Sequence, residues 1–393
     1  MKILVLGSGL MGPAAAYNVM SDSQVTQVVV CDMSQQQLDN CLRKLGDKKG
    51  TEKLSMVLLD LNDQARTVQL MKGFQAIIAA LPHAASIVSI RAAVKAGVPI
   101  VDLSRLADEQ VAMLRQEVKA GRGFVVLGCG LEPGLTEIMA RHLAEKLDRV
   151  DEIHIKCGGI PEKPAPPLGY KIVFGGRQLP LHESDALMVK DGQLQPVPRY
   201  SGVEQVAFAG VGECEAWHEG FMLWLMELPA LKRLRVGTQK TVRWPGYAAK
   251  VTLLKEIGLL GQKPVLVDNV EVSPKKLLDA LLYPRLRLEE GERDITCFRV
   301  EAIGQVDGHP RRYVIDMVDR YDPLLGFTSM ARTTAFTGAI VTRMIARGDL
   351  QASGAVMPEQ VITGPLFHCL VKELAEAGVR FDITEERVQA LSS

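Results

Sequence analysis

Three glycines near the N-terminus have a spacing that suits the binding of phosphate groups. Gly7, Gly9 and Gly12 form the pattern G-x-G-x-x-G directly after the apolar run 3–6 and ahead of a helical segment. In such a turn the first glycine permits a tight bend, the second lets the backbone approach a pyrophosphate, and the third lets the helix pack against the strand. The helix N-terminus adds free N–H groups. The residues of this turn predicted to contact a dinucleotide are Gly7, Ser8, Gly9, Leu10, Met11 and Gly12.

An acidic residue stands at the end of the next predicted strand. Asp32 follows the apolar run 25–31 and lies 20 residues beyond Gly12. A carboxylate there accepts hydrogen bonds from the adenosine ribose, and its charge repels the 2′-phosphate of NADP. Because neither Arg nor Lys occurs in the segment 33–35, we expect NAD as the cofactor, with NADP less favoured. The alternative is a chance glycine turn with a surface Asp.

Further cofactor contacts are expected where the other predicted strands end, because ligands of such sheets bind outside the carboxyl ends of the strands. Packing at the strand end is an equally good explanation of these residues. The predicted contacts are Met33, Asp60, Leu61, Ala79, Ala80, Leu81, Pro82 and Asp102.

The elements that must position these residues alternate between apolar runs and helical segments up to about residue 131. This alternation predicts a doubly wound parallel sheet of the Rossmann type. The predicted strands are 3–6, 25–31, 54–59, 76–81, 100–103 and 124–127, and the helix before the last of them extends through Lys119.

Beyond residue 131 the pattern changes to that of a second, α+β domain with a mostly antiparallel sheet, so the fold class is α/β with two different domains. We expect a dinucleotide-binding domain at 1–131, a substrate-binding and dimerisation domain at 132–325, and C-terminal helices at 326–393 that pack back on the first domain. The outer face of the second sheet has no identifiable helical cover, which predicts a homodimer. The predicted strands are 152–156, 171–174, 241–244, 297–304 and 312–318, and the predicted helices are 136–146, 248–258, 274–282 and 330–347.

Composition restricts the partners. The 46 basic and 46 acidic residues balance, so no net field attracts nucleic acid or an anionic membrane, and a small-molecule substrate is expected. No apolar run is long enough for a membrane-spanning helix. The seven cysteines are scattered and form no C-x-x-C pair, and no histidine pair has ligand spacing, so neither a disulfide framework nor a metal is expected. A reducing, cytoplasmic location fits this pattern.

Five sequence blocks in order carry a family resemblance. They are VLGSGLMG, GCGLEPGLTEIMA, KCGGIPEKPAPPLGYKIVF, TVRWPGYAAKVTLLKEIGL and SMARTTAFTGAIVTRMIARG. With them the chain resembles the saccharopine dehydrogenase-like family, which includes glutamate-forming saccharopine reductases and bacterial lysine 6-dehydrogenases. Its length and C-terminal blocks look closer to the lysine 6-dehydrogenases, whereas the LGYK run looks more like the saccharopine branch.

The resemblance implies an enzyme that oxidises the ε-amine of lysine with NAD, releasing ammonia and a semialdehyde that cyclises to a piperideine carboxylate. The saccharopine reductases tend to prefer NADP, so Asp32 favours the lysine branch. An alternative is saccharopine or carboxynorspermidine chemistry on a secondary amine. A further alternative is a dinucleotide sensor without catalysis.

Amine oxidation requires a base for the amine proton and later an activated water. His83 and Glu132 both follow strand ends and are the catalytic candidates. The family's reductases have Tyr near the first position and Asp at the second. The alternatives are a solvated histidine and a glutamate that caps the helix near Gly134.

The resemblance also implies substrate contacts in the second domain. Lys171 and Arg243 match positions that bind a carboxylate, although either could form an ordinary ion pair. Cys157 is expected to be a small wall of the pocket more than a nucleophile. Trp217 and His218 could cover the aliphatic part of the substrate, and the alternative for Trp217 is core packing.

Overall fold

The computed structural model describes residues 1–118, 123–174, 176 and 178–387. Contacts divide it into two compact units. The first contains Met1–Met139, Asp322–Phe327 and Ala331–Arg380, and the second contains Ala140–Tyr321, Thr328–Met330 and Phe381–Ser393. We describe each unit by itself.

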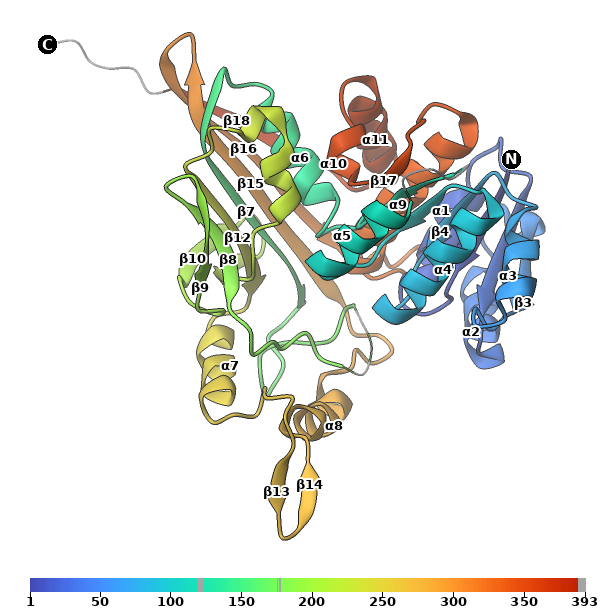
Figure 1. Cartoon of the computed structure of the whole chain (residues 1–393), viewed down its shortest axis with the longest axis horizontal. Coiled ribbons are helices and arrows are strands. Elements are labelled where there is room, and N and C mark those ends of the chain that lie inside the picture. The colour runs from blue at the N-terminus through green and yellow to red at the C-terminus, as the bar shows by residue number, and fades with distance from the viewer. Residues whose placement is uncertain (119–122, 175, 177, 388–393) are drawn as a thin grey trace, which may run out of the picture. The chain divides into compact units, whose positions relative to one another are not determined.

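The first unit is built on a seven-stranded parallel sheet with the order β17-β6-β5-β4-β1-β2-β3. This confirms the predicted doubly wound sheet, and β17 from near the C-terminus extends it (Figure 1). The strands are β1 (Lys2–Leu6), β2 (Gln27–Asp32), β3 (Leu54–Leu58), β4 (Ala76–Ala79), β5 (Ile100–Asp102), β6 (Phe124–Val126) and β17 (Gly354–Val356).

Helices connect these strands. Ser34 and Asp63 are the N-caps of α2 and α3, where each side chain accepts a hydrogen bond from a backbone N–H of the first turn. The predicted helix end at Lys119 lies outside the described residues. The helices are α1 (Gly12–Met20), α2 (Gln35–Leu45), α3 (Gln64–Met71), α4 (His83–Ala96), α5 (Asp108–Glu117), α10 (Pro358–Val361) and α11 (Pro365–Glu376), while α6 (Leu135–Ala144) and α9 (Ser329–Arg347) have residues in both units.

The second unit contains a nine-stranded sheet with the path β10-β11-β12-β7-β15-β16-β18, and off this path β8 pairs with β12 and β9 pairs with β8. Only the β12–β7 pair is parallel among its described pairs, which confirms the predicted mostly antiparallel sheet. The strands are β7 (Arg149–Pro161), β8 (Ala186–Lys190), β9 (Gln193–Val197), β10 (Glu204–Phe208), β11 (Gly212–His218), β12 (Val236–Arg243), β15 (Asp294–Val306), β16 (His309–Arg320) and β18 (Asp382–Arg387).

Two helices, α7 (Tyr247–Glu256) and α8 (Pro274–Leu286), accompany this sheet, and the small hairpin of β13 (Val265–Val267) and β14 (Val270–Val272) projects beside α8 (Figure 1). The predicted strand 171–174 is wrong, since its described residues form one isolated bridge, Ile172 to Arg287. The residues Tyr170 and Ile172 are buried there by side-chain packing from a loop, so their apolar character does not indicate a strand. No helix among the described residues is long and apolar enough to cross a membrane.

Candidate functional site

Of the three glycines in the turn after β1, only Gly9 has space for a side chain. Gly7 has a φ of 89°, and a Cβ added to it would lie 2.4 Å from the Ala80 carbonyl oxygen. A Cβ on Gly12 would lie 2.0 Å from the Gly7 carbonyl oxygen, so this glycine permits the helix to pack against the turn. A Cβ on Gly9 would meet no atom within 4 Å. This open position is the one at which a pyrophosphate has to approach the backbone.

Asp32 is hydrogen-bonded to the same turn. The Ser8 backbone N–H and hydroxyl both donate to Asp32 Oδ2 at 2.8 Å, and the Ser34 N–H donates to Oδ1 at 2.9 Å. The carboxylate is half-buried. Because two carboxylate oxygens offer about four acceptor positions, acceptor capacity remains for ribose hydroxyls. The neighbouring Met33 and Leu10 side chains are exposed and available as apolar contacts.

The other strand-end residues differ in how accessible they are. Asp60 is exposed, and its Oδ1 accepts from the backbone and side-chain amides of Asn62 at 2.9 Å. Ala79 is buried within β4, whereas Ala80, Leu81 and Leu61 are half-buried. Pro82 is exposed and is the N-cap of α4. Their contacts with a dinucleotide stay predictions.

Asp102 is fully buried at the end of β5. Ser86 Oγ lies 2.7 Å from one carboxyl oxygen, and Ser104 Oγ donates to the other at 2.8 Å. Burial raises the pKa of this carboxyl to about 6. Since the side chain has no exposed atom for a ligand, nothing here supports a direct cofactor contact.

The two catalytic candidates follow β4 and β6, which end at the same edge of the parallel sheet. His83 begins α4 and is exposed. Desolvation by neighbouring protein atoms and the positive charge of Arg105 lower the pKa of His83, so its imidazole is neutral and can accept a proton at neutral pH. Glu132 is half-buried before a cis peptide bond to Pro133. A helix cap near Gly134 was the alternative role for Glu132. The Gly134 N–H at the start of α6 donates to Glu137 Oε2 at 2.6 Å, so Glu137 caps this amide.

In the second unit the end of β12 places a buried guanidinium among aromatic rings. The Cζ of Arg243 lies 4.6 Å from the ring centroid of Tyr170 and 5.6 Å from that of Tyr247. Trp217 stacks on Tyr247 at 5.9 Å, and Tyr200 lies 4.8 Å from Trp217. Sequence reasoning missed the three tyrosines, although Tyr170 and Tyr247 lie within the LGYK and WPGY runs.

No carboxylate of the described residues pairs with Arg243. Its Nη1 donates to the Val242 carbonyl at 2.8 Å, and its buried Nε has no partner. Glu215, the residue opposite it on β11, instead accepts hydrogen bonds from the N–H groups of Gly246 and Ala248 and so caps α7. A buried cation without a counter-ion is costly. The guanidinium is therefore suited to bind a ligand carboxylate.

The other predicted substrate residues are either paired or buried within the protein. Lys171 Nζ lies 2.9 Å from Glu292 Oε1 and also donates to the Arg287 carbonyl, which is the ordinary ion pair considered above. Trp217 is buried in a hydrophobic core cluster, which agrees with core packing, the alternative given for this residue above. His218 is buried, and desolvation and Lys240 lower its pKa. Cys157 is buried on β7. Roles for Cys157 and His218 in substrate binding stay predictions.

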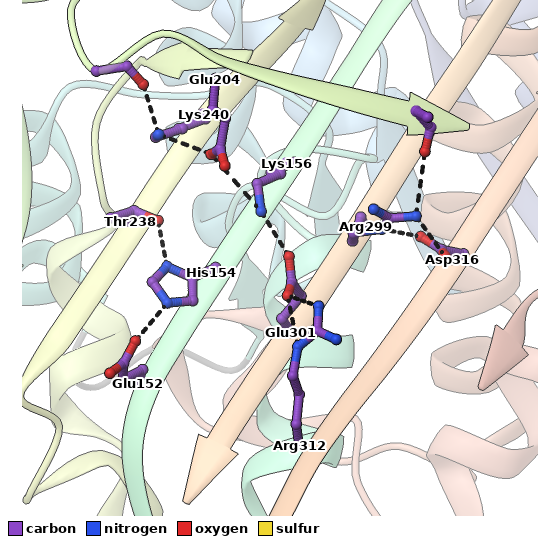
Figure 2. Close-up of polar contacts among 12 residues, drawn as sticks. Glu152, His154, Lys156, Glu204, Thr238, Lys240, Arg299, Glu301, Arg312 and Asp316 are labelled. Carbon is purple, nitrogen blue, oxygen red and sulfur yellow. Dashed lines mark hydrogen bonds and ion pairs between the residues drawn. The ribbon is translucent and has the colours of Figure 1, made fainter. Parts of the chain in front are cut away.

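A second group of charged side chains lies on one face of the large sheet, and Figure 2 shows that its members pair with one another. Lys156 Nζ lies 2.6 Å from Glu301 Oε1, and Arg312 binds the other oxygen of that carboxylate. Lys240 pairs with Glu204 at 2.8 Å. Because these charges neutralise one another, we interpret the network as a structural feature. Among the described residues no group of three or more His, Cys, Asp or Glu could hold a metal ion.

Comparisons with known proteins agree with this arrangement. Two family models match, the saccharopine dehydrogenase NADP binding domain at residues 3–126 and the saccharopine dehydrogenase C-terminal domain at residues 130–379. Carboxynorspermidine synthase of Vibrio alginolyticus is 22% identical over 344 residues, which cover 80% of each chain. Saccharopine dehydrogenase (NADP(+), L-glutamate-forming) of Schizosaccharomyces pombe is 22% identical, with 97% of this chain and 98% of that protein covered.

Among solved structures, apo saccharopine dehydrogenase (L-Glu forming) from Saccharomyces cerevisiae matches with a TM-score of 0.80. The match covers 98% of this chain and 99% of that one at 18% sequence identity. At this identity the similarity concerns the fold alone.

Proposed function

Because the chain belongs to the saccharopine dehydrogenase family, a family of dinucleotide-dependent oxidoreductases, we propose that it oxidises the ε-amine of L-lysine with NAD. The observation that carries the choice of an amino-acid substrate is Arg243, a buried guanidinium without a carboxylate partner in the described chain. An α-carboxylate would supply the missing counter-ion, and the rings of Tyr170 and Tyr247 would keep water away from the pair.

For the cofactor we propose NAD, although the named relatives include NADP-dependent enzymes. Asp32 supports this choice because its fixed negative charge, held by Ser8 and Ser34, would meet the 2′-phosphate of NADP. The exposed Gly9 backbone would carry the pyrophosphate. When bound, the nicotinamide ring accepts the hydride that leaves the carbon next to the amine.

His83 and Glu132 would handle the protons. The amine must be neutral when the hydride leaves, and the unprotonated His83 imidazole can accept the ammonium proton. The C–N bond then becomes an imine, and Glu132 would remove a proton from the water that attacks its carbon. Ammonia and the semialdehyde leave, and the semialdehyde cyclises with its own α-amine to a piperideine carboxylate.

The test measures initial rates of reduced-dinucleotide formation from L-lysine and from saccharopine, each with NAD and with NADP. We expect the highest kcat/KM with lysine and NAD. Turnover of saccharopine alone would replace the proposed substrate with a secondary amine. That second candidate is favoured by the relatives named saccharopine dehydrogenase and carboxynorspermidine synthase.

Variants separate an enzyme from a dinucleotide sensor. His83→Gln and Glu132→Gln should each lower kcat by about a hundredfold, the usual range for loss of a general base, with dinucleotide affinity unchanged. Glu132→Asp is the matched control, because it keeps a carboxylate at this position. Absence of turnover by the unaltered protein on every amine tested would support the sensor.

The homodimer predicted from the sequence is kept as a proposal. Light scattering of the purified protein tests it, and a mass near that of one chain, 43.0 kDa, would contradict it.

A further inference from the structure

At the end of β5, the side-chain oxygens of three residues form a closed ring of short polar contacts. Ser86 Oγ lies 2.7 Å from Asp102 Oδ1, and Ser104 Oγ lies 2.8 Å from Asp102 Oδ2. The two hydroxyl oxygens are 2.7 Å from each other. The Ser104 backbone N–H also points to Oδ2, at 3.3 Å. Asp102 ends β5, Ser86 lies in the first turn of α4, and Ser104 follows β5.

The number of hydroxyl protons does not match the number of contacts. Each of the three oxygen–oxygen distances is that of an O–H···O hydrogen bond. Ser86 and Ser104 bring one hydroxyl proton each, so two contacts are satisfied and the third places lone pairs against each other. A proton on Asp102 supplies the missing donor. Asp102 then donates to Ser86, Ser86 donates to Ser104, and Ser104 donates back to the carboxyl group.

The surroundings also favour the protonated carboxyl. Asp102 and Ser86 are fully buried, and no cationic side chain in the described part of the chain interacts with the carboxyl. One titratable neighbour in the described part of the chain is the buried Cys129 thiol, whose pKa is raised by burial, so it stays neutral. The Asp102 carbonyl accepts the Cys129 N–H at 2.7 Å, which fixes the backbone beneath the carboxyl group.

We propose that Asp102 acts as a neutral acid that closes this ring and so positions the first turn of α4, and that ionisation of Asp102 opens the ring. Ser86 is one turn along α4 from His83, and its backbone N–H donates to the Pro82 carbonyl at 3.0 Å. Asp102 is thus a positioning residue whose ionisation loosens the turn that carries His83. This consequence rests on the proposed function of His83, whereas the ring itself does not.

The ring responds to pH in one direction. Burial raises the pKa of Asp102 from 3.8 to about 6, so the folded state holds the proton more tightly than the unfolded state does. The ring is closed below that pKa. Above it the carboxylate accepts both hydroxyl protons, and the two serine oxygens must move apart.

A carbon-13 titration of the aspartate carboxyl groups tests the protonation without requiring turnover. One resonance, missing in Asp102→Asn and shifted in Ser104→Ala, should titrate with a midpoint near pH 6. A midpoint near the ordinary value of 3.8 would overturn the proposal. If Asp102→Asn does not fold, the shift in Ser104→Ala still identifies the resonance.

Hydrogen exchange at the first turn of α4 tests the positioning. Asn at position 102 can donate to Ser86 and accept from Ser104, so it keeps the ring closed at every pH. The measured quantity is the exchange rate of the amides in the first turn of α4, corrected for the intrinsic pH dependence of exchange. In the unaltered protein this rate should rise about tenfold between about pH 5 and about pH 8. In Asp102→Asn it should stay constant. Equal pH dependence in the two proteins would contradict the positioning role, whatever their activity.

Discussion

The dinucleotide region of the first unit and the Arg243 cluster of the second are assembled in different ways. In the first unit the backbone forms the site. Gly7 and Gly12 have no space for a side chain, and backbone N–H groups bind the Asp32 carboxylate. In the second unit, side chains from positions 170 to 247 converge around one buried charge. A site built by the backbone leaves a short motif in the sequence, and a site built by distant side chains does not.

The largest expected effect is on the glycine turn. Gly12→Ala places a methyl group against the Gly7 carbonyl and should destabilise the protein by about 3 kcal/mol, the upper range for overpacking. Gly9→Ala is the matched control, because its Cβ meets no atom within 4 Å. It should leave the melting temperature unchanged and weaken dinucleotide binding. Equal melting temperatures of the two variants would contradict the separate roles of these glycines.

The next effect concerns the buried cation. Arg243→Met should lower kcat/KM for lysine by about a hundredfold, which corresponds to about 2.7 kcal/mol of lost charge-assisted hydrogen bonding. Stability should be equal or higher, because an apolar side chain replaces an unpaired buried charge. Lys171→Met serves as the control and should change kcat/KM little, since Lys171 pairs with Glu292. Lower stability with unchanged kcat/KM would make Arg243 a structural residue.

A smaller effect is expected in the charged network of Figure 2, which we interpret as a structural feature of the second unit. Although burial opposes it, hydrogen bonds and charges from Lys156 and Arg312 lower the pKa of Glu301 from 4.5 to about 2. Its contribution to stability is therefore present above about pH 4.5 and is lost as the pH falls toward 2. Glu301→Gln should cost about 2 kcal/mol at neutral pH.

Urea denaturation at several pH values measures this difference. The difference in free energy of unfolding between Glu301→Gln and the unaltered protein should become smaller as the solution becomes more acidic. A gap that is independent of pH would contradict the charged role of Glu301. Turnover of lysine by the folded variant should be unchanged.

The smallest effect separates the two dinucleotides. Asp32→Asn removes the charge but keeps acceptor capacity, so the ratio of NAD to NADP affinity should fall about tenfold, or about 1.4 kcal/mol. Fluorescence titration of both dinucleotides measures it. Ser8→Ala, which removes one hydrogen bond to Asp32 and no charge, is the control. An unchanged ratio in Asp32→Asn would mean that the preference arises elsewhere.

The same contrast explains what the sequence could predict. The order β1 to β6 follows from apolar runs because the central strands of a parallel sheet are buried on both faces. β17 could not be predicted, because three residues near the C-terminus carry no strand pattern and join the sheet only through tertiary contacts. The strands β8 to β11 were missed for a similar reason. Their polar and apolar residues are mixed, and pairing with neighbouring strands defines them.

At the site, the dinucleotide motif and Arg243 could be proposed from residue types and the family resemblance. The partners of these residues could not. Nothing in the spacing indicates that Glu215 caps α7, that Glu292 binds Lys171, or that two serines enclose Asp102. Except for the contact between Ser104 and Asp102, these pairings join positions that are separated in the chain, so they depend on the folded structure.

The most direct test of the proposed amine oxidation follows the transferred hydride. Lysine carrying deuterium at the ε-carbon should be incubated with NAD and the protein, and the reduced dinucleotide analysed by mass spectrometry. We expect reduced NAD that contains one deuterium atom, together with ammonia and a piperideine carboxylate. Reduced NAD without deuterium, or no reduced dinucleotide from lysine in conditions where saccharopine is turned over, would contradict the account.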